Sequence, residues 1–209
     1  MQWEAGVTKL LLVRHGHVDG IAPERFRGRR DIPLSPQGIL QARAVAERIA
    51  RQWRPGVIYT SPLQRCVRTA ESITAATGVG AQILGDLIDL DYGGWQWLTR
   101  NEVRRQWPAL IDLWDTAPHL VRFPNGDSLQ DLIGRVSNVL RMVLDRHPRD
   151  TVVVVGHDSG NRALLLQLLD QPIAAYWRLT QDPCGLSEID AAPNAVRLIT
   201  LNDTSHLRG

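Results

Sequence analysis

Two histidines of this chain each follow a short apolar run of the kind that forms a buried strand. The run 10–13 is followed by Arg14 and His15, and the run 151–155 is followed, after one glycine, by His157. An arginine offers a planar fork of donors to phosphoryl oxygens, and a neutral imidazole can attack phosphorus. A glycine beside each histidine permits a positive φ or a close approach of the backbone to an anion. These residue types indicate phosphoryl chemistry.

Parallel strands joined by helices would bring these residues together. Runs such as 10–13 are typical of buried parallel strands, and ligands bind at the carboxyl ends of such strands in open α/β sheets. Further strands are expected at 57–59, 82–84, 185–189 and 195–201, and helices are expected after Ser35-Pro36, over 63–77 closed by Gly78, after Gly126-Asp127-Ser128, and over about 161–169. The repeated alternation predicts an α/β fold, a three-layer αβα sandwich around a mostly parallel sheet.

Two stretches lack the periodicity of strands or helices. The stretch 18–33 is rich in Arg, Gly, Pro and Asp, which is typical of a long functional loop. The interval 90–124 holds four tryptophans at irregular spacing, and we interpret it as a partly helical lid over the sheet edge. We expect these tryptophans to pack within the lid rather than to form an aromatic cage. One domain is predicted over 1–209, with a lid-like insertion at about 90–125.

Composition argues against several functional classes. The 209 residues suit one domain, and 44% apolar with 22% charged residues is ordinary for a soluble globular protein. The formal net charge of +2 gives no reason to expect nucleic acid or a membrane as a partner. Cys66 and Cys184 have neither metal-ligand spacing nor the density of a disulfide scaffold, and no apolar run is long enough to cross a bilayer. We therefore expect a soluble, cytoplasmic protein.

Four separated motifs resemble those of the histidine phosphatase superfamily, the phosphoglycerate mutase-like proteins. They are Arg14-His15-Gly16, Ser61-Pro62-Leu63-Gln64-Arg65 followed by Thr69-Ala70, Leu87-Ile88-Asp89-Leu90-Asp91-Tyr92-Gly93-Gly94-Trp95, and Gly156-His157. Their order and spacing cover nearly the whole chain, and the resemblance implies the phosphoglycerate mutase-like fold. The segment after Trp95 is similar to the phosphatase branch, whereas mutases typically carry a longer insertion and lysines that this chain lacks.

The resemblance implies a role for each of four side chains. His15 takes the place of the nucleophile, which needs one unprotonated ring nitrogen and a backbone carbonyl that holds the other. Arg14, Arg65 and His157 take the places of groups that bind the phosphoryl oxygens and compensate their charge in the transition state. The resulting pocket needs no metal and no cofactor.

The proton donor is where this chain departs from the family pattern. Phosphatases of the family usually carry a glutamate at the position of Asp89, which is one methylene shorter. Asp89 could protonate the leaving alkoxide if the pocket raises its pKa toward neutrality. Because a displacement of ~1 Å can cost about 10²-fold in rate, the backbone must come closer or the activity is weak. Asp91 is the rival acid, and we favour Asp89.

Three further residues are candidates for binding the substrate. His17 stands where a glutamate is common, and it adds a titratable donor beside the phosphate or points to solvent. Arg27 stands in the loop where the family contacts substrate, so it favours an acidic substrate tail or belongs to a solvated basic loop. Ser159 opens a helix whose N–H groups could bind an oxygen of the substrate, or it only caps that helix. Asp127-Ser128 stands where Glu-Ser is common, and capping is expected there.

The predicted function is that of a phosphomonoesterase that hydrolyses a small phosphorylated metabolite through a phosphohistidine intermediate. Two alternatives remain open, a cofactor-dependent phosphoglycerate mutase and a phosphoanion-binding pseudophosphatase, the latter because of Asp89 and His17. The identity of the metabolite, the strength of the activity and the oligomeric state, a homodimer included, are left open at this point.

Overall fold

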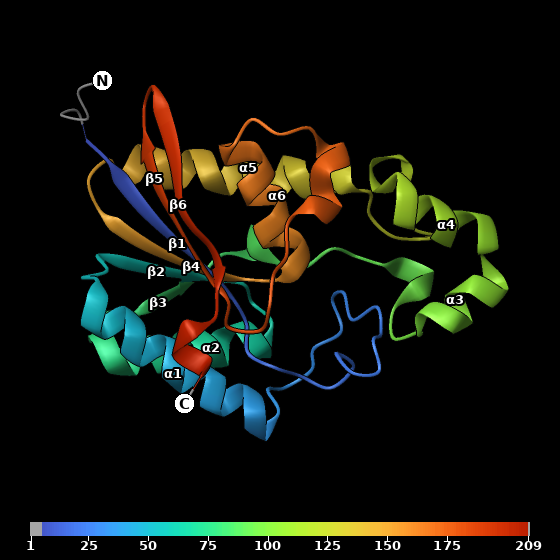
Figure 1. Cartoon of the computed structure of the whole chain (residues 1–209), viewed down its shortest axis with the longest axis horizontal. Helices are drawn as coiled ribbons and strands as arrows, with labels where there is room; N and C mark the ends of the chain where they lie inside the picture. Colours follow the sequence, from blue (N-terminus) through green and yellow to red (C-terminus); the bar gives the residue numbers. More distant parts are fainter. Residues whose placement is uncertain (1–5, 209) are drawn as a thin grey trace.

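A six-stranded sheet forms the middle of the computed structural model, which describes residues 6–208 (Figure 1). The strands are β1 Thr8–Arg14, β2 Val57–Thr60, β3 Ala81–Ile83, β4 Thr151–Gly156, β5 Leu186–Ala192 and β6 Ala195–Asp203. Their order across the sheet is β3-β2-β4-β1-β5-β6. β3, β2, β4 and β1 pair in parallel, β5 is antiparallel to β1, and β6 is antiparallel to β5. The predicted mostly parallel sheet is confirmed.

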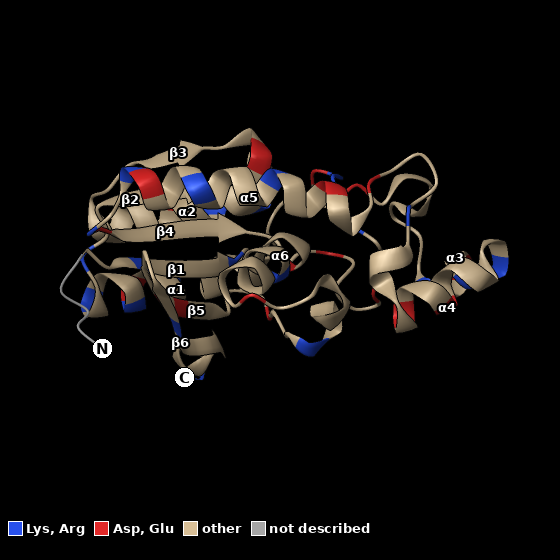
Figure 2. Cartoon of the chain, turned by 90° about the horizontal axis from the view of Figure 1, so that it is seen from above, with Lys and Arg blue, Asp and Glu red and all other residues tan. Residues whose placement is uncertain are grey.

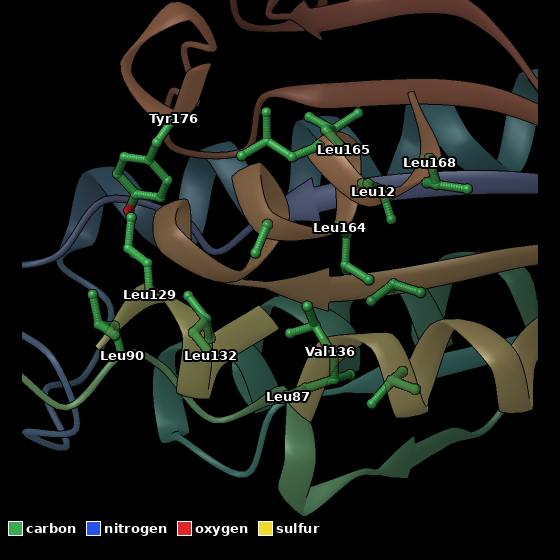
Figure 3. Close-up of a cluster of buried hydrophobic side chains, with 14 of the residues drawn as sticks. Leu12, Leu87, Leu90, Leu129, Leu132, Val136, Leu164, Leu165, Leu168 and Tyr176 are labelled. Carbon is green, nitrogen blue, oxygen red and sulfur yellow. The ribbon is translucent and has the colours of Figure 1, made fainter. Parts of the chain in front are cut away.

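Helices cover both faces of this sheet. The α-helices of residues 6–208 are α1 Pro36–Gln52, α2 Gln64–Thr77, α3 Arg100–Gln106, α4 Pro108–Thr116, α5 Leu129–Arg146 and α6 Asp158–Leu168. α1 and α2 lie on one face and pack on Leu11 and Val13, whereas α5 and α6 pack on the opposite face, on Leu10 and Leu12 (Figures 1 and 3). Alternate residues of β1 therefore serve two separate cores, which explains why its run is apolar without interruption. The three-layer sandwich is confirmed.

The register of the two central strands positions the histidines. Leu10 pairs with Val152 and the pairing continues to Arg14 with Gly156. The next hydrogen bond joins the His15 amide to the Gly156 carbonyl at 3.0 Å. His15 and His157 therefore leave the sheet at the same level, at the carboxyl ends of adjacent parallel strands.

Most predicted helix ends are confirmed. Ser35 Oγ accepts from the Gly38 amide at the start of α1, and Gly78 closes α2 with φ 76°. At the start of α5, Ser128 and Asp131 form a capping box. The expected capping by Asp127 is wrong for that side chain, which instead accepts from two arginines described below.

Helix α6 starts three residues earlier than the sequence predicts. The helix begins at Asp158 because His157 is itself the N-cap, with the extended backbone angles φ −117° and ψ 164°. Ser159 therefore lies inside the first turn. Strand β3 is also displaced by one residue from its predicted position.

The interval that was predicted as a lid contains α3 and α4, which extend beyond the end of the sheet (Figure 2). Trp95 and Trp114 are buried and pack around Phe123, with ring centroids 5.0 and 5.1 Å from it. The prediction that these two tryptophans pack is confirmed. That the interval acts as a lid stays a prediction. Within residues 6–208, no helix has the length and apolarity required to cross a bilayer.

Candidate active site

His15 lies just beyond β1 in a buried cluster of side chains. The other members of this cluster are Arg14, Arg65, Asp89 and His157. The side chain of His15 is almost fully buried, and its Nδ1 lies 2.7 Å from the carbonyl oxygen of Gly16. A carbonyl only accepts, so Nδ1 carries the proton and Nε2 carries the lone pair. Burial, together with the charges of Arg65 and Arg14 and the neighbouring His157, holds the pKa of His15 well below its ordinary value. The ring is therefore neutral near pH 7 and has the tautomer that nucleophilic attack requires.

The two glycines beside the histidines allow close packing within the protein. A Cβ on Gly16 would lie 2.5 Å from the Gly38 carbonyl oxygen in α1, and one on Gly156 would lie 2.6 Å from Asn161 Oδ1 in α6. Neither glycine has a positive φ. The close approach of the strand ends to the helices therefore favours glycine at both positions, and the approach of the backbone to an anion stays a prediction.

His157 faces His15 across the cluster, with ring centroids 5.3 Å apart. Arg65 Nε donates to His157 Nδ1 at 3.3 Å, so the proton of the neutral ring lies on Nε2, which donates to Ser61 Oγ at 2.7 Å. Burial, followed by the charges of Arg65 and Arg14, lowers the pKa of His157 well below its ordinary value. The two imidazoles are therefore both neutral and carry opposite tautomers.

Two arginines supply the positive charge of the cluster. Arg65 is completely buried and donates to the carbonyls of Gly28 at 2.7 Å and Arg30 at 2.8 Å, which ties it to the loop 18–33. Arg14 donates to the Gln181 carbonyl, while its Nε is a buried donor without an acceptor in the described part of the chain. An unpaired buried donor is costly, and a phosphoryl oxygen is the kind of partner that would satisfy it.

Asp89 completes the cluster. Its Oδ2 lies 3.2 Å from Arg65 Nη2 and 3.7 Å from His157 Nδ1, and its Oδ1 accepts from the Leu90 amide at 2.9 Å. Burial raises the pKa of Asp89, although Arg65 acts in the opposite direction. The direction is the one that a proton donor needs.

The rival carboxylate, Asp91, has a different environment. Its Oδ1 accepts from the Gly93 amide at 2.8 Å, and its Oδ2 lies 3.4 Å from Arg29 Nη1. These contacts are those of a turn-forming aspartate. The geometry therefore favours Asp89 over Asp91 as the acid, and the assignment of either to catalysis stays a prediction.

A cavity of about 100 Å³ adjoins the cluster at Asp89. Its walls carry charges of both signs beside aromatic rings; they are formed by Glu24, Arg25, Phe26, Arg27, Gly28, Asp89, Tyr92, Arg100, Trp114, Asp158, Ser159, Arg162 and Trp177. The cavity therefore offers donors and acceptors of both charges beside Asp89.

The sequence of the whole domain identifies its family. The profile of the histidine phosphatase superfamily (branch 1) matches residues 10–204. The chain belongs to this superfamily. It is 33% identical over 201 residues to phosphoserine phosphatase 1 of Hydrogenobacter thermophilus, which covers 96% of this chain and 95% of that protein. It is 29% identical over 214 residues to the metal-independent phosphoserine phosphatase of Arabidopsis thaliana, covering 98% of this chain and 85% of that protein.

Solved structures of the superfamily have the same fold. YhfR of Bacillus stearothermophilus superposes with a TM-score of 0.89 at 26% identity, covering 96% of this chain and 99% of that one. A mycobacterial glucosyl-3-phosphoglycerate phosphatase in complex with VO3 superposes with a TM-score of 0.87 at 26% identity, covering 94% of this chain and all of that one.

In this histidine phosphatase the three predicted substrate-binding residues are not all close to the cluster. Arg27 and Ser159 line the cavity, and Ser159 Oγ lies 3.1 Å from the hydroxyl of Tyr92. His17 instead places its Nδ1 2.8 Å from Ser35 Oγ at the start of α1. A part for His17 in substrate binding stays a prediction, and its observed contact is one that steadies a helix end.

Some residues of the site were missed by reasoning from sequence. Ser61 accepts a hydrogen bond from His157, and Tyr92 lines the cavity. Both residues lie inside the recognised motifs, but the motifs did not indicate what these two side chains contact. Arg162 was not singled out at all; it pairs with Asp158 at 2.6 Å and lies 4.9 Å from the ring of Trp177. An arginine within an apolar helix that follows the second histidine was the available signal.

Proposed function

We propose that this histidine phosphatase hydrolyses a small phosphomonoester through a phosphohistidine formed on His15. The observation that carries the proposal is the convergence of Arg14, His15, Arg65, Asp89 and His157 in one buried cluster. Relatives that carry the name phosphoserine phosphatase, one of them described as metal-independent, support the chemistry of a metal-independent phosphatase. The position of the Asp89 carboxyl, 3.2 Å from Arg65 Nη2 and 3.7 Å from His157 Nδ1, supports turnover over a pseudophosphatase that only binds phosphate.

The reaction divides into two displacements at phosphorus. His15 Nε2 attacks, the P–O bond to the alcohol breaks, and Asp89 gives its proton to the departing oxygen. Water then attacks the phosphohistidine, Asp89 takes a proton from it, and His15 leaves as the neutral ring. Arg14 and Arg65 compensate the charge that spreads over the equatorial oxygens, and His157 orients Arg65 through its Nδ1.

The cavity supports an acidic metabolite as the substrate. Arg27 lies close enough to Asp89 and Arg14 for their charges to act on its pKa, which burial lowers. Arg27, Arg100 and Arg162 offer donors to a carboxylate, while Glu24 and Asp158 can accept from an ammonium group. Relatives named as phosphoserine and glucosyl-3-phosphoglycerate phosphatases support this class.

We also propose that the chain forms one domain in which the interval 90–125 closes over this cavity.

The substrate class is tested with two esters that differ in one group. O-phosphoserine and O-phosphoethanolamine share the phosphate and the amine, but only the first carries a carboxylate. A charge-assisted hydrogen bond contributes about 1.5–3 kcal/mol, so kcat/KM for phosphoserine is expected to be roughly tenfold to a hundredfold higher. Release of inorganic phosphate in the presence of a chelator measures both rates. Equal rates would contradict recognition of the carboxylate, and loss of activity with the chelator would contradict metal independence.

A phosphoglycerate mutase is the second candidate. The chain is 33% identical over 189 residues to a probable phosphoglycerate mutase, GpmB, of Cronobacter sakazakii, covering 88% of this chain and 85% of that protein. A mutase would interconvert phosphoglycerates in a coupled assay when 2,3-bisphosphoglycerate is present, and would release little phosphate. We expect release of phosphate without interconversion.

The pH dependence of kcat/KM is expected to be bell-shaped, with His15 setting the acid limb and Asp89 the alkaline limb. The pKa of His15 is lowered from 6.5, so the reactive neutral ring persists as the pH falls and is lost only in acid. The pKa of Asp89 is raised from 3.8, so the protonated acid persists above the ordinary range and is lost as the pH rises. Asp89→Asn is therefore expected to lose the enzyme's alkaline limb.

The profiles of the wild type and Asp89→Asn are measured with the same aryl phosphate. The ionisation of the substrate is then common to both proteins and cancels in the comparison. An alkaline limb that is the same in both would contradict the assignment of that limb to Asp89.

A further inference from the structure

The carboxylate of Asp127 binds two arginines just before α5. Its Oδ2 lies 2.9 Å from Arg29 Nη2 and 3.0 Å from Arg135 Nη2, and it also accepts from the Asp91 amide at 3.2 Å. Arg29 comes from the loop 18–33, Arg135 comes from α5, and Asp91 belongs to the segment 88–92. A single carboxylate therefore joins three separate segments. None of the three charged side chains is among the walls of the cavity.

Both arginines also donate to the main chain of the predicted acid. Arg29 Nε donates to the Asp89 carbonyl at 3.3 Å, and Arg135 Nη2 donates to the same oxygen at 3.4 Å. Arg135 Nη1 donates to the Ile88 carbonyl at 2.7 Å. The segment 88–92 is neither helix nor strand, so neither a helix nor a strand ladder fixes its position. Together with the hydrogen bond from the Asp127 amide to the Asp91 carbonyl at 2.9 Å, these arginine contacts hold the segment.

We propose that Asp127, Arg29 and Arg135 form a positioning unit that holds the backbone of Asp89 so that its short side chain reaches the leaving oxygen. The inference rests on the proposed function of Asp89 as the proton donor. A side chain of one methylene offers little freedom to correct an error of the backbone, and a misplacement of ~1 Å can cost about 10²-fold in rate. Asp127 aligns both guanidinium groups through one carboxylate oxygen, which adds to their hydrogen bonds with the backbone.

The proposal predicts a loss of rate that depends on the leaving group. Phenol is a poor leaving group that needs a proton, whereas 2,4-dinitrophenol departs without one. Asp127→Asn keeps the shape of the side chain but removes its charge, and we expect kcat to fall about 10- to 100-fold with phenyl phosphate. With 2,4-dinitrophenyl phosphate we expect a fall of less than about threefold, because His15 and the arginines of the cluster stay in place. KM is expected to change little for either ester.

Matched variants separate positioning from general damage. Asp190→Asn breaks another ion pair, with Lys9 at 2.6 Å, at the opposite end of β1 from His15, and is expected to change neither rate. Arg135→Gln removes the donors to the main chain of 88–89 and is expected to reproduce the asymmetry of Asp127→Asn. Asp127→Glu restores the charge and is expected to recover part of the loss with phenyl phosphate.

The outcomes are distinct. Equal losses with both esters in Asp127→Asn and Arg135→Gln would assign them a general structural role and overturn the proposal, as would unchanged rates in both. If Asp127→Asn does not fold, Arg135→Gln decides by the same comparison. A wild type without turnover, or an Asp89→Asn variant without the leaving-group asymmetry, would instead overturn the proposed function of the cluster.

Discussion

His15→Ala is expected to lower the kcat for phosphate release by about 10⁴-fold or more, because the other imidazole of the cluster, His157, has its lone pair held by Arg65 Nε. The structure supplies the reasons in the tautomer and the charge of this ring. Nδ1 is held by the Gly16 carbonyl, and the pKa of the ring is lowered, so Nε2 is ready to attack. Turnover of p-nitrophenyl phosphate gives the rate.

The intermediate itself can be trapped. A single turnover quenched in alkali, in which phosphohistidine survives, is expected to leave phosphate on the wild type and none on His15→Ala. His147→Ala is the matched control, since His147 contacts Tyr59 and Asp150 at the opposite end of the sheet. A His15→Ala protein that keeps the wild-type rate would refute His15 as the nucleophile.

Asp89→Asn is expected to reduce kcat by about 10²- to 10⁴-fold with alkyl phosphates, whose leaving groups require a proton. The buried position beside Arg65 and His157 and the raised pKa of Asp89 support this effect. Asn keeps the acceptor for the Leu90 amide, so the local backbone is preserved. Steady-state hydrolysis of an alkyl ester and of 2,4-dinitrophenyl phosphate measures the change.

Asp91→Asn provides the comparison that decides between the two carboxylates. Its contacts with Gly93 and Arg29 are structural, so we expect a loss below about tenfold, of similar size for both esters. If Asp91→Asn instead shows the larger and leaving-group-dependent loss, Asp91 is the acid and the geometric argument for Asp89 is wrong.

Local patterns in the sequence were sufficient for most of the secondary structure. Apolar runs of four or five residues predicted β1 and β4, and Ser35-Pro36, Gly78 and Ser128 predicted the ends of three helices. Such features act over one or two turns of chain, so they survive in the folded protein. The start of α6 was predicted too late, because a histidine as the N-cap has no side-chain signature of capping.

The site was predicted in part. Arg14 and His15 follow one strand and His157 follows another, and the prediction that both histidines stand at one sheet edge depended only on strands 1 and 4 being parallel neighbours. Arg65 was predicted from its motif. Its partners in the loop 18–33 were not, because hydrogen bonds to backbone carbonyls leave no trace in side-chain type.

The sequence by itself determined which residues can do the chemistry and which strands carry them, because both follow from side-chain type and short-range periodicity. Only the tertiary structure decided how they act. It buried Asp89 while leaving Asp91 in a turn, turned His17 toward Ser35, and gave Asp127 two arginines in place of a helix end. Burial and charge at a point in space are set by segments that lie far apart in the chain, and the pKa and position of a catalytic group depend on both.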